Sequence, residues 1–157
     1  MKMIFQLLLL LVIVILLVYL FFQFAGTLLA PGVSKLSIGE VCIKNNCFQV
    51  EIAKTALERD KGLMYREKLD RDKGMLFIFN KEGIYPFWMK NTLIPLDIVW
   101  IDANNKVVFV GENVQPCKTL ICSSVVPNSK AKYVLEINSG ICQEIGLKVG
   151  DEIEIKN

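Results

Sequence analysis

Histidine is absent from this chain of 157 residues. Its absence excludes Ser-His-Asp and Cys-His catalysis, histidine-ligated metals and histidine general bases. Any chemistry must therefore rest on carboxylates, lysine, tyrosine, cysteine or serine. The sequence predicts neither a metal site nor a bound cofactor.

An excess of charge of either sign is also lacking. The 18 Lys and Arg residues are balanced by 16 Asp and Glu residues, which gives a formal net charge of +2. Nucleic-acid binding uses clustered basic charge, whereas the charges of this chain are interspersed as on an ordinary solvated surface. We therefore expect no nucleic-acid partner.

Residues 4–24 lack any charged side chain. At about 1.5 Å per helical residue this run is about 30 Å long, which matches the hydrocarbon thickness of a bilayer. A cleaved signal peptide is the alternative, but its apolar core is usually only about 7–15 residues long. The length favours an uncleaved signal-anchor over residues 1–25.

The charges that flank this run predict its orientation. Lys2 precedes the run, and the first charge after it is Lys35. The positive-inside rule then keeps the N-terminus in the cytoplasm. We expect a single-pass protein of the cell membrane, with a linker over residues 26–37 and one soluble domain over residues 38–157, outside the cytoplasm.

Residues 86–100 form the most apolar run after the N-terminal segment, yet they include Lys90, Asn91 and Asp97. Alternation in an extended chain would place each of the two charges among apolar neighbours. Burying an unpaired charge costs several kcal/mol or more, so both need partners, a solvated pocket or a ligand. This run is the sequence's strongest candidate for a functional site.

The remaining patterns predict short strands and two short helices. Alternating polarity over residues 48–52 indicates a strand with one buried face. Thr55 and Glu58 fit a capping box that opens a helix ended by Gly62, and Asn138 or Ser139 can cap a second helix. Further strands are expected at residues 36–43, 74–79, 107–110, 133–137 and 149–155. The sequence thus predicts an α+β fold: a compact, mostly antiparallel, barrel-like β domain with two short helices, preceded by one transmembrane helix.

The cysteines fall into two pairs with the same spacing and one single residue. Four residues separate Cys42 from Cys47, and four separate Cys117 from Cys122. A four-residue hairpin loop would place the first pair directly opposite, within disulfide reach. Two local disulfides are the favoured interpretation outside the cytoplasm, and a four-thiolate zinc site or buried thiols are the alternatives. Cys142 has no histidine to activate it, and we expect a buried, inert thiol.

Four segments carry a resemblance to a known family. They are residues 62–66 (GLM-x-R), 74–77 (GMLF), 87–98 (FWMKNT-x-x-PLDI) and 133–136 (YVLE). From about Val50 to Ile155 the chain resembles the widespread prokaryotic family called domain of unknown function 192. The resemblance implies a compact, mostly β single domain, often exported or membrane-anchored, with no established activity. It implies that the paired cysteines are an addition found in a subgroup of the family, where they stabilise the fold and take no part in chemistry.

Six residues match the polar positions characteristic of that family: Arg66, Trp88, Lys90, Asn91, Asp97 and Glu136. The charged ones among them either line a ligand pocket, with Trp88 as a stacking wall, or form a buried ion network that closes the barrel. Three functions follow. A binding module for a polar small molecule or glycan ranks first, and a structural or assembly factor for another envelope protein ranks second. A hydrolase that uses Asp97 and Glu136 ranks third and requires carboxyls about 5–9.5 Å apart.

Overall fold

The computed structural model describes residues 2–28, 36–119 and 121–156. The chain divides between Lys35 and Leu36 into two compact units, and each is described by itself. The first contains helix α1 (Lys2–Leu28), which continues past the predicted end at residue 25. The rest of the predicted linker lies almost entirely outside the described residues.

Helix α1 is apolar on all sides. Its segment Ile4–Gln23 has a mean hydropathy of 3.2 and is long and apolar enough to cross a membrane. A helix without a polar face is typical of a membrane span, although a signal sequence meets the same description. The apolar helix is therefore as predicted, and its role as an uncleaved anchor stays a prediction.

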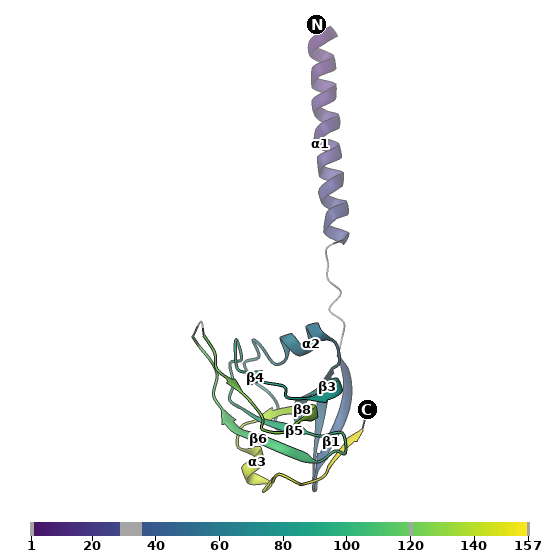
Figure 1. Ribbon diagram of the computed structural model, residues 1–157. Helices are drawn as coiled ribbons and strands as arrows, with labels where there is room; N and C mark the ends of the chain where they lie inside the picture. The colour runs from purple at the N-terminus through teal and green to yellow at the C-terminus, as the bar shows by residue number, and fades with distance from the viewer. Residues whose placement is uncertain (1, 29–35, 120, 157) are drawn as a thin grey trace. The chain divides into compact units, whose positions relative to one another are not determined.

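The second unit is built on a seven-stranded sheet in the order β6-β5-β8-β3-β2-β1-β9 (Figure 1). Neighbouring strands are antiparallel except β2 and β3, which are parallel. The strands are β1 (Ser37–Ile43), β2 (Asn46–Ala53), β3 (Lys73–Gly83), β5 (Leu96–Ile101), β6 (Val107–Val114), β8 (Ala131–Asn138) and β9 (Ile153–Lys156).

The two edges of this sheet meet at one end. Lys106 at the start of β6 forms a bridge with Glu152 just before β9. Next to it the Val107 N–H donates to the Asp151 carbonyl at 2.9 Å, and the Gly150 N–H donates to the Val107 carbonyl at 2.8 Å. The sheet is therefore a half-barrel, and the predicted α+β, barrel-like fold is confirmed.

Four small elements lie outside the seven-stranded sheet. Strand β4 (Phe87–Trp88) pairs with β7 (Ser124–Val125) in a two-stranded sheet, and the short helices are α2 (Ala56–Lys61) and α3 (Ile141–Glu144). The predicted capping box of α2 is present, with Thr55 and Glu58 in both reciprocal bonds. The predicted cap of α3 was wrong. Its N-cap is Gly140, which has no side chain, and Asp97 of β5 accepts the Cys142 N–H instead.

Removing the α2 cap should lower the stability of the domain by about 1 kcal/mol, because Thr55→Ala leaves an N–H of the first turn without its acceptor. Thr55→Ser keeps the oxygen and should stay close to wild type. Urea unfolding of both variants checks the prediction, and equal destabilisation by the two substitutions would contradict it.

Apolar side chains pack on both faces of the sheet. One face carries the larger core, which includes Val41, Val50, Leu76, Val99, Leu135 and Ile137. The other face carries a second core under α2 and β4, which includes Leu63, Met75, Phe77, Met89, Ile98 and Trp100. Strand β5 and the central parts of β3 and β8 are buried on both sides, so a polar side chain there needs its own partner on either face.

The cysteine pairs have the predicted pairing. Cys42 and Cys47 are register partners on β1 and β2 with sulfurs 2.10 Å apart, and the sulfurs of Cys117 and Cys122 are 2.14 Å apart. Cys142 is a free, fully buried thiol. Burial, followed by the nearby Asp97 carboxylate, raises its pKa, which is the inert state expected for it.

Candidate functional site

Glu136 is the central residue of the candidate site. It lies on β8 between Met75 of β3 and Ile98 of β5, on the sheet face of the second core, and is 5% exposed. Its Oε2 atom has no hydrogen-bond partner among the residues that the structure describes. Burial raises the pKa of Glu136 to about 8, and the charge of Arg66 opposes this in part. A neutral carboxylic acid is therefore the main form at pH 7.

Arg66 makes its principal contact with a residue that the sequence analysis missed. Its two terminal nitrogens donate to the Glu51 carboxylate at 2.6 and 2.7 Å, in the bidentate geometry of a strong ion pair. This hydrogen bonding lowers the pKa of Glu51 and raises that of Arg66. Glu51 lies on β2, where its alternation with Phe48 and Val50 indicated an ordinary solvated position. Because Glu51 takes the guanidinium, no ion pair joins Arg66 to Glu136 in the part of the chain that the structure describes.

Asn91 and Tyr65 fix the loop beside this pair. Both have left-handed backbone angles, with φ of 56° and 63°, and this conformation is uncommon for tyrosine. The Asn91 amide donates to the Tyr65 hydroxyl at 2.8 Å, and the Tyr65 N–H donates to the Asn91 carbonyl at 2.8 Å. These two bonds join the loop after α2 to the loop after β4. Tyr65 is thus a second residue that sequence reasoning missed.

Trp88 and Lys90 lie at the surface of the same region. Trp88 is 47% exposed, and the Lys90 ammonium lies 5.1 Å from the centre of its indole ring, as in a cation–π contact. No ion pair of Lys90 is found within the described ranges. Within those ranges Lys90 therefore takes no part in the buried ion network that was one of the two expectations.

A narrow cavity of about 30 Å³ lies between Glu136 and Trp88. Its walls include Glu136, Trp88, Thr92, Phe87 and Leu63. This volume accommodates one or two water-sized groups, so a larger molecule can insert no more than its terminal group.

Asp97 lies on the opposite face of the sheet. It pairs in register with Ile137, the residue next to Glu136, and successive residues of a strand point to opposite faces. Asp97 is fully buried and accepts the N–H groups of Asn113 and Cys142, both at 2.8 Å. The structure therefore separates Asp97 from the other five predicted site residues, and Asp97 and Glu136 do not face one cleft as an acid–base pair requires.

The model of a family described as "Uncharacterized ACR", the domain of unknown function 192, matches residues 39–155. The chain belongs to this family. It is 28% identical over 111 residues to the UPF0127 protein of Thermococcus sibiricus, a match that covers 68% of this chain and 65% of the relative's length.

Two solved structures resemble this member of the family. A protein of unknown function from Novosphingobium aromaticivorans is 35% identical, with a TM-score of 0.72 over 78% of this chain and 89% of that chain. A putative transcription regulator from Sinorhizobium meliloti is 30% identical, with a TM-score of 0.71 over 79% of this chain and 98% of that one.

Proposed function

We propose that this domain of unknown function 192 is a membrane-anchored, extracytoplasmic binding module. Its ligand is a polar small molecule or glycan whose terminal group enters the cavity beside Glu136. The observation that carries the proposal is the unpartnered Oε2 of Glu136 in a cavity next to a half-exposed tryptophan.

An unpartnered buried polar atom destabilises a fold by about 1–3 kcal/mol, so a ligand that supplies the missing hydrogen bond gains affinity. A protonated Glu136 both donates and accepts, and a ligand hydroxyl has the complementary donor and acceptor. The half-exposed indole ring of Trp88 offers the rest of a sugar an apolar face for stacking and an N–H donor.

The same site favours a neutral ligand over an anion. The Arg66 guanidinium is already satisfied by Glu51, so it is not available as the clamp for a carboxylate or phosphate. Lys90 is occupied on the Trp88 ring. The two cations Arg66 and Lys90 are thus engaged with other side chains, which supports recognition by hydroxyl groups. Arg59, Asp60 and Lys61 also line the cavity.

The membrane part of the proposal rests on α1 and on the cysteines. An apolar helix of this length can hold the domain at a bilayer, and local disulfides are typical of oxidising compartments.

A binding screen of neutral polyols, monosaccharides and oligosaccharides tests the proposal. For a ligand that binds the wild-type chain, Trp88→Ala and Glu136→Leu should each weaken binding about tenfold, equal to about 1.4 kcal/mol. Val149→Ala removes an exposed apolar side chain elsewhere and should leave the affinity unchanged. Titration calorimetry or tryptophan fluorescence measures the affinities. Ligand binding that is indifferent to both site substitutions would contradict the proposal.

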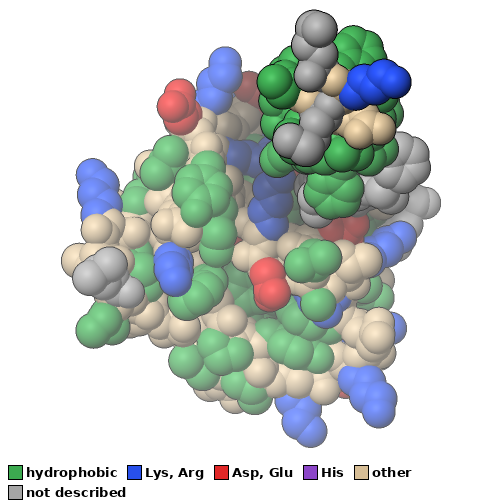
Figure 2. All heavy atoms as spheres, turned by 90° about the horizontal axis from the view of Figure 1, so that it is seen from above, with side chains coloured by type: hydrophobic (Ala, Val, Ile, Leu, Met, Phe, Trp, Pro, Cys, Tyr) green, Lys and Arg blue, Asp and Glu red, His purple; other side chains and the backbone are tan. Residues whose placement is uncertain are grey.

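A role as an assembly factor is the second candidate, and exposed apolar side chains favour it. Leu57, Tyr65, Trp88 and Leu93 are each about half exposed or more. Figure 2 shows the domain from the side of α2 and β4, where apolar side chains lie among basic ones. An apolar surface of this kind suits a protein partner. Co-purification of an envelope protein that is lost in Trp88→Ala, without small-molecule binding, would favour this role.

The two remaining roles have no support from the site. A carboxylate hydrolase needs two carboxyls on one cleft, and Asp97 and Glu136 lie on opposite sheet faces. A nucleic-acid role would need a basic excess that the net charge of +2 does not supply.

A further inference from the structure

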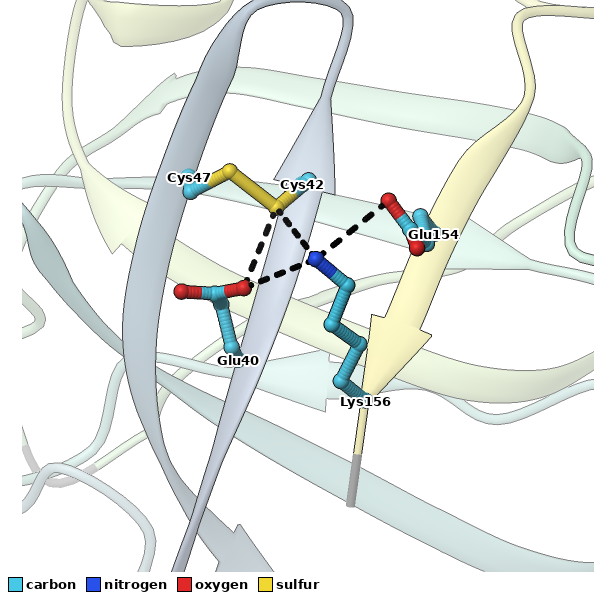
Figure 3. Close-up of polar contacts among 5 residues, drawn as sticks. All are labelled: Glu40, Cys42, Cys47, Glu154 and Lys156. Carbon is cyan, nitrogen blue, oxygen red and sulfur yellow. Dashed lines mark hydrogen bonds and ion pairs between the residues drawn. A yellow bond between two sulfur atoms is a disulfide. The ribbon is translucent and has the colours of Figure 1, made fainter.

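A second group of reactive side chains lies at the other end of the domain, on the hairpin of β1 and β2 (Figure 3). Glu40 and Cys42 share one face of β1, and Cys47 of β2 is the register partner of Cys42. One carboxylate oxygen of Glu40 and the two sulfurs all lie within 4.8 Å of one another. The Cys42 sulfur is 3.5 Å from that oxygen.

We propose that this hairpin has two chemical forms: the disulfide, and a reduced form in which Glu40, Cys42 and Cys47 bind a thiophilic metal ion of the zinc class.

The chemistry needs a thiol reductant. A thiolate attacks one sulfur of the disulfide and forms a mixed disulfide, and the other sulfur leaves with the electron pair of the broken bond. A second thiol resolves the mixed disulfide, so two reductant thiols are oxidised to one disulfide and both cysteines become thiols. Metal binding then releases two protons from the thiols and leaves a position for water beside two thiolates and one carboxylate, each of which is a zinc ligand type.

The exposure of the two sulfurs suits this sequence. Cys47 is exposed, whereas Cys42 is 6% exposed, so an external thiolate can reach Cys47. A groove of about 530 Å³ lies beside Cys42 and is lined in part by Glu154 and Ile155 of β9. This groove gives a metal ion and its water a path to the buried sulfur.

The charges on the neighbouring strand show why a cation would be held there. The ammonium of Lys156 on β9 lies 3.1 Å from Glu40, 3.6 Å from Glu154 and 4.0 Å from the Cys42 sulfur. In the oxidised form this one cation faces two carboxylates. Reduction adds two thiols, and the negative charge of the two carboxylates opposes their ionisation to thiolates. A bound metal ion supplies positive charge and favours that ionisation. The Lys156 side chain is 52% exposed and can turn to Glu154 when a metal takes its place at Glu40.

The second cysteine pair lacks these features. The sulfurs of Cys117 and Cys122 contact the hydroxyl or carbonyl of Thr119, at 3.4–3.9 Å. No carboxylate joins them in a metal-ligating group within the described ranges. This pair is therefore a matched internal control.

The test uses the full-length chain in detergent, reduced with a phosphine that is then removed, and Co²⁺ as the spectroscopic probe. In a Cys117→Ser/Cys122→Ser background, we expect one Co²⁺ per chain, an intense sulfur-to-cobalt absorption band and release of two protons. Glu40→Gln should weaken Co²⁺ binding by about tenfold or more, a loss that even outer-shell ligands cause. Lys156→Gln removes a competing cation and should tighten binding.

Circular dichroism of each reduced variant separates loss of a ligand from loss of the fold. Co²⁺ binding by the reduced chain but not by the disulfide form supports the proposal. Weaker Co²⁺ binding in Glu40→Gln together with tighter binding in Lys156→Gln supports it as well. Absence of Co²⁺ binding by the folded, reduced chain would overturn it. So would an unchanged Co²⁺ spectrum in Cys42→Ser/Cys47→Ser, because the sulfur ligands would then lie elsewhere.

Discussion

The domain of residues 36–157 should become less stable as the pH rises from about 5 to 8. Burial raises the pKa of Glu136 from 4.5 to about 8, so in this interval the folded state holds a proton that the unfolded chain has released. Stability falls with pH wherever the folded state binds more protons, and one proton corresponds to about 1.4 kcal/mol per pH unit. The loss begins near the unfolded pKa and ends once the pH exceeds the folded pKa.

The full effect of this single carboxyl is roughly 5 kcal/mol at most, which is comparable to the whole stability of a small domain. The pKa values of Glu51 and Glu58 are lowered, so these two carboxyls make the domain less stable as the pH falls. Their effect lies below about pH 4.5, where protonation breaks their interactions. Measurements between pH 5 and 9 therefore isolate Glu136 from these two carboxyls.

Glu136→Gln provides the control, because the amide has nearly the same shape and does not titrate. Urea unfolding at a series of pH values should show a falling midpoint for the wild type and a flatter profile for the variant. Above pH 8 the variant should be the more stable of the two. Equal pH profiles for both proteins would show that Glu136 carries no proton in the fold at neutral pH.

Asp97→Ala should cost about 3–5 kcal/mol of stability. The Asp97 carboxylate accepts the N–H groups of Asn113 and Cys142 in a fully buried position. Each N–H left without an acceptor in the interior costs about 1–3 kcal/mol, and the alanine also leaves a void. One of these bonds holds the start of α3, which has no cap of its own.

Asp102 offers a matched comparison for this prediction. Its carboxylate also accepts two backbone N–H groups, those of Asn104 and Lys106, but in an exposed turn where water can replace it. Asp102→Ala should therefore cost about 1 kcal/mol, well below the cost at Asp97. Similar urea midpoints for the two variants would show that burial does not set the cost.

Local patterns predicted much of the local structure, with the cap of α3 as an exception. The capping box of α2 depends on residues three apart, and the Cys42–Cys47 disulfide, the favoured of three interpretations, depends on one hairpin, so both rest on residues that are close in sequence. The half-barrel also follows from strands whose alternation indicates their buried faces.

The grouping of site residues could not be predicted in the same way. Whether Asp97 and Glu136 share a face depends on the register between β5 and β8, and a shift of one residue would reverse the answer. The partner of Arg66 was missed for a similar reason. Glu51 lies on β2, and Arg66 lies in the segment that joins β2 to β3. The parallel pairing of these two strands brings the segment back to β2, and no local pattern indicates that pairing.

The parallel pairing of β2 and β3 has an evolutionary consequence. Two parallel neighbours cannot be joined by a tight turn, so the chain must cross over between them, and residues 54–72 make this crossover. That one segment contains α2, Tyr65 and Arg66, and so provides a whole wall of the candidate site. Connecting segments accept substitution and changes of length more readily than the strands they join. Because residues 62–66 within the crossover match the family motif, we expect relatives with the same sheet to differ in length in the rest of this segment.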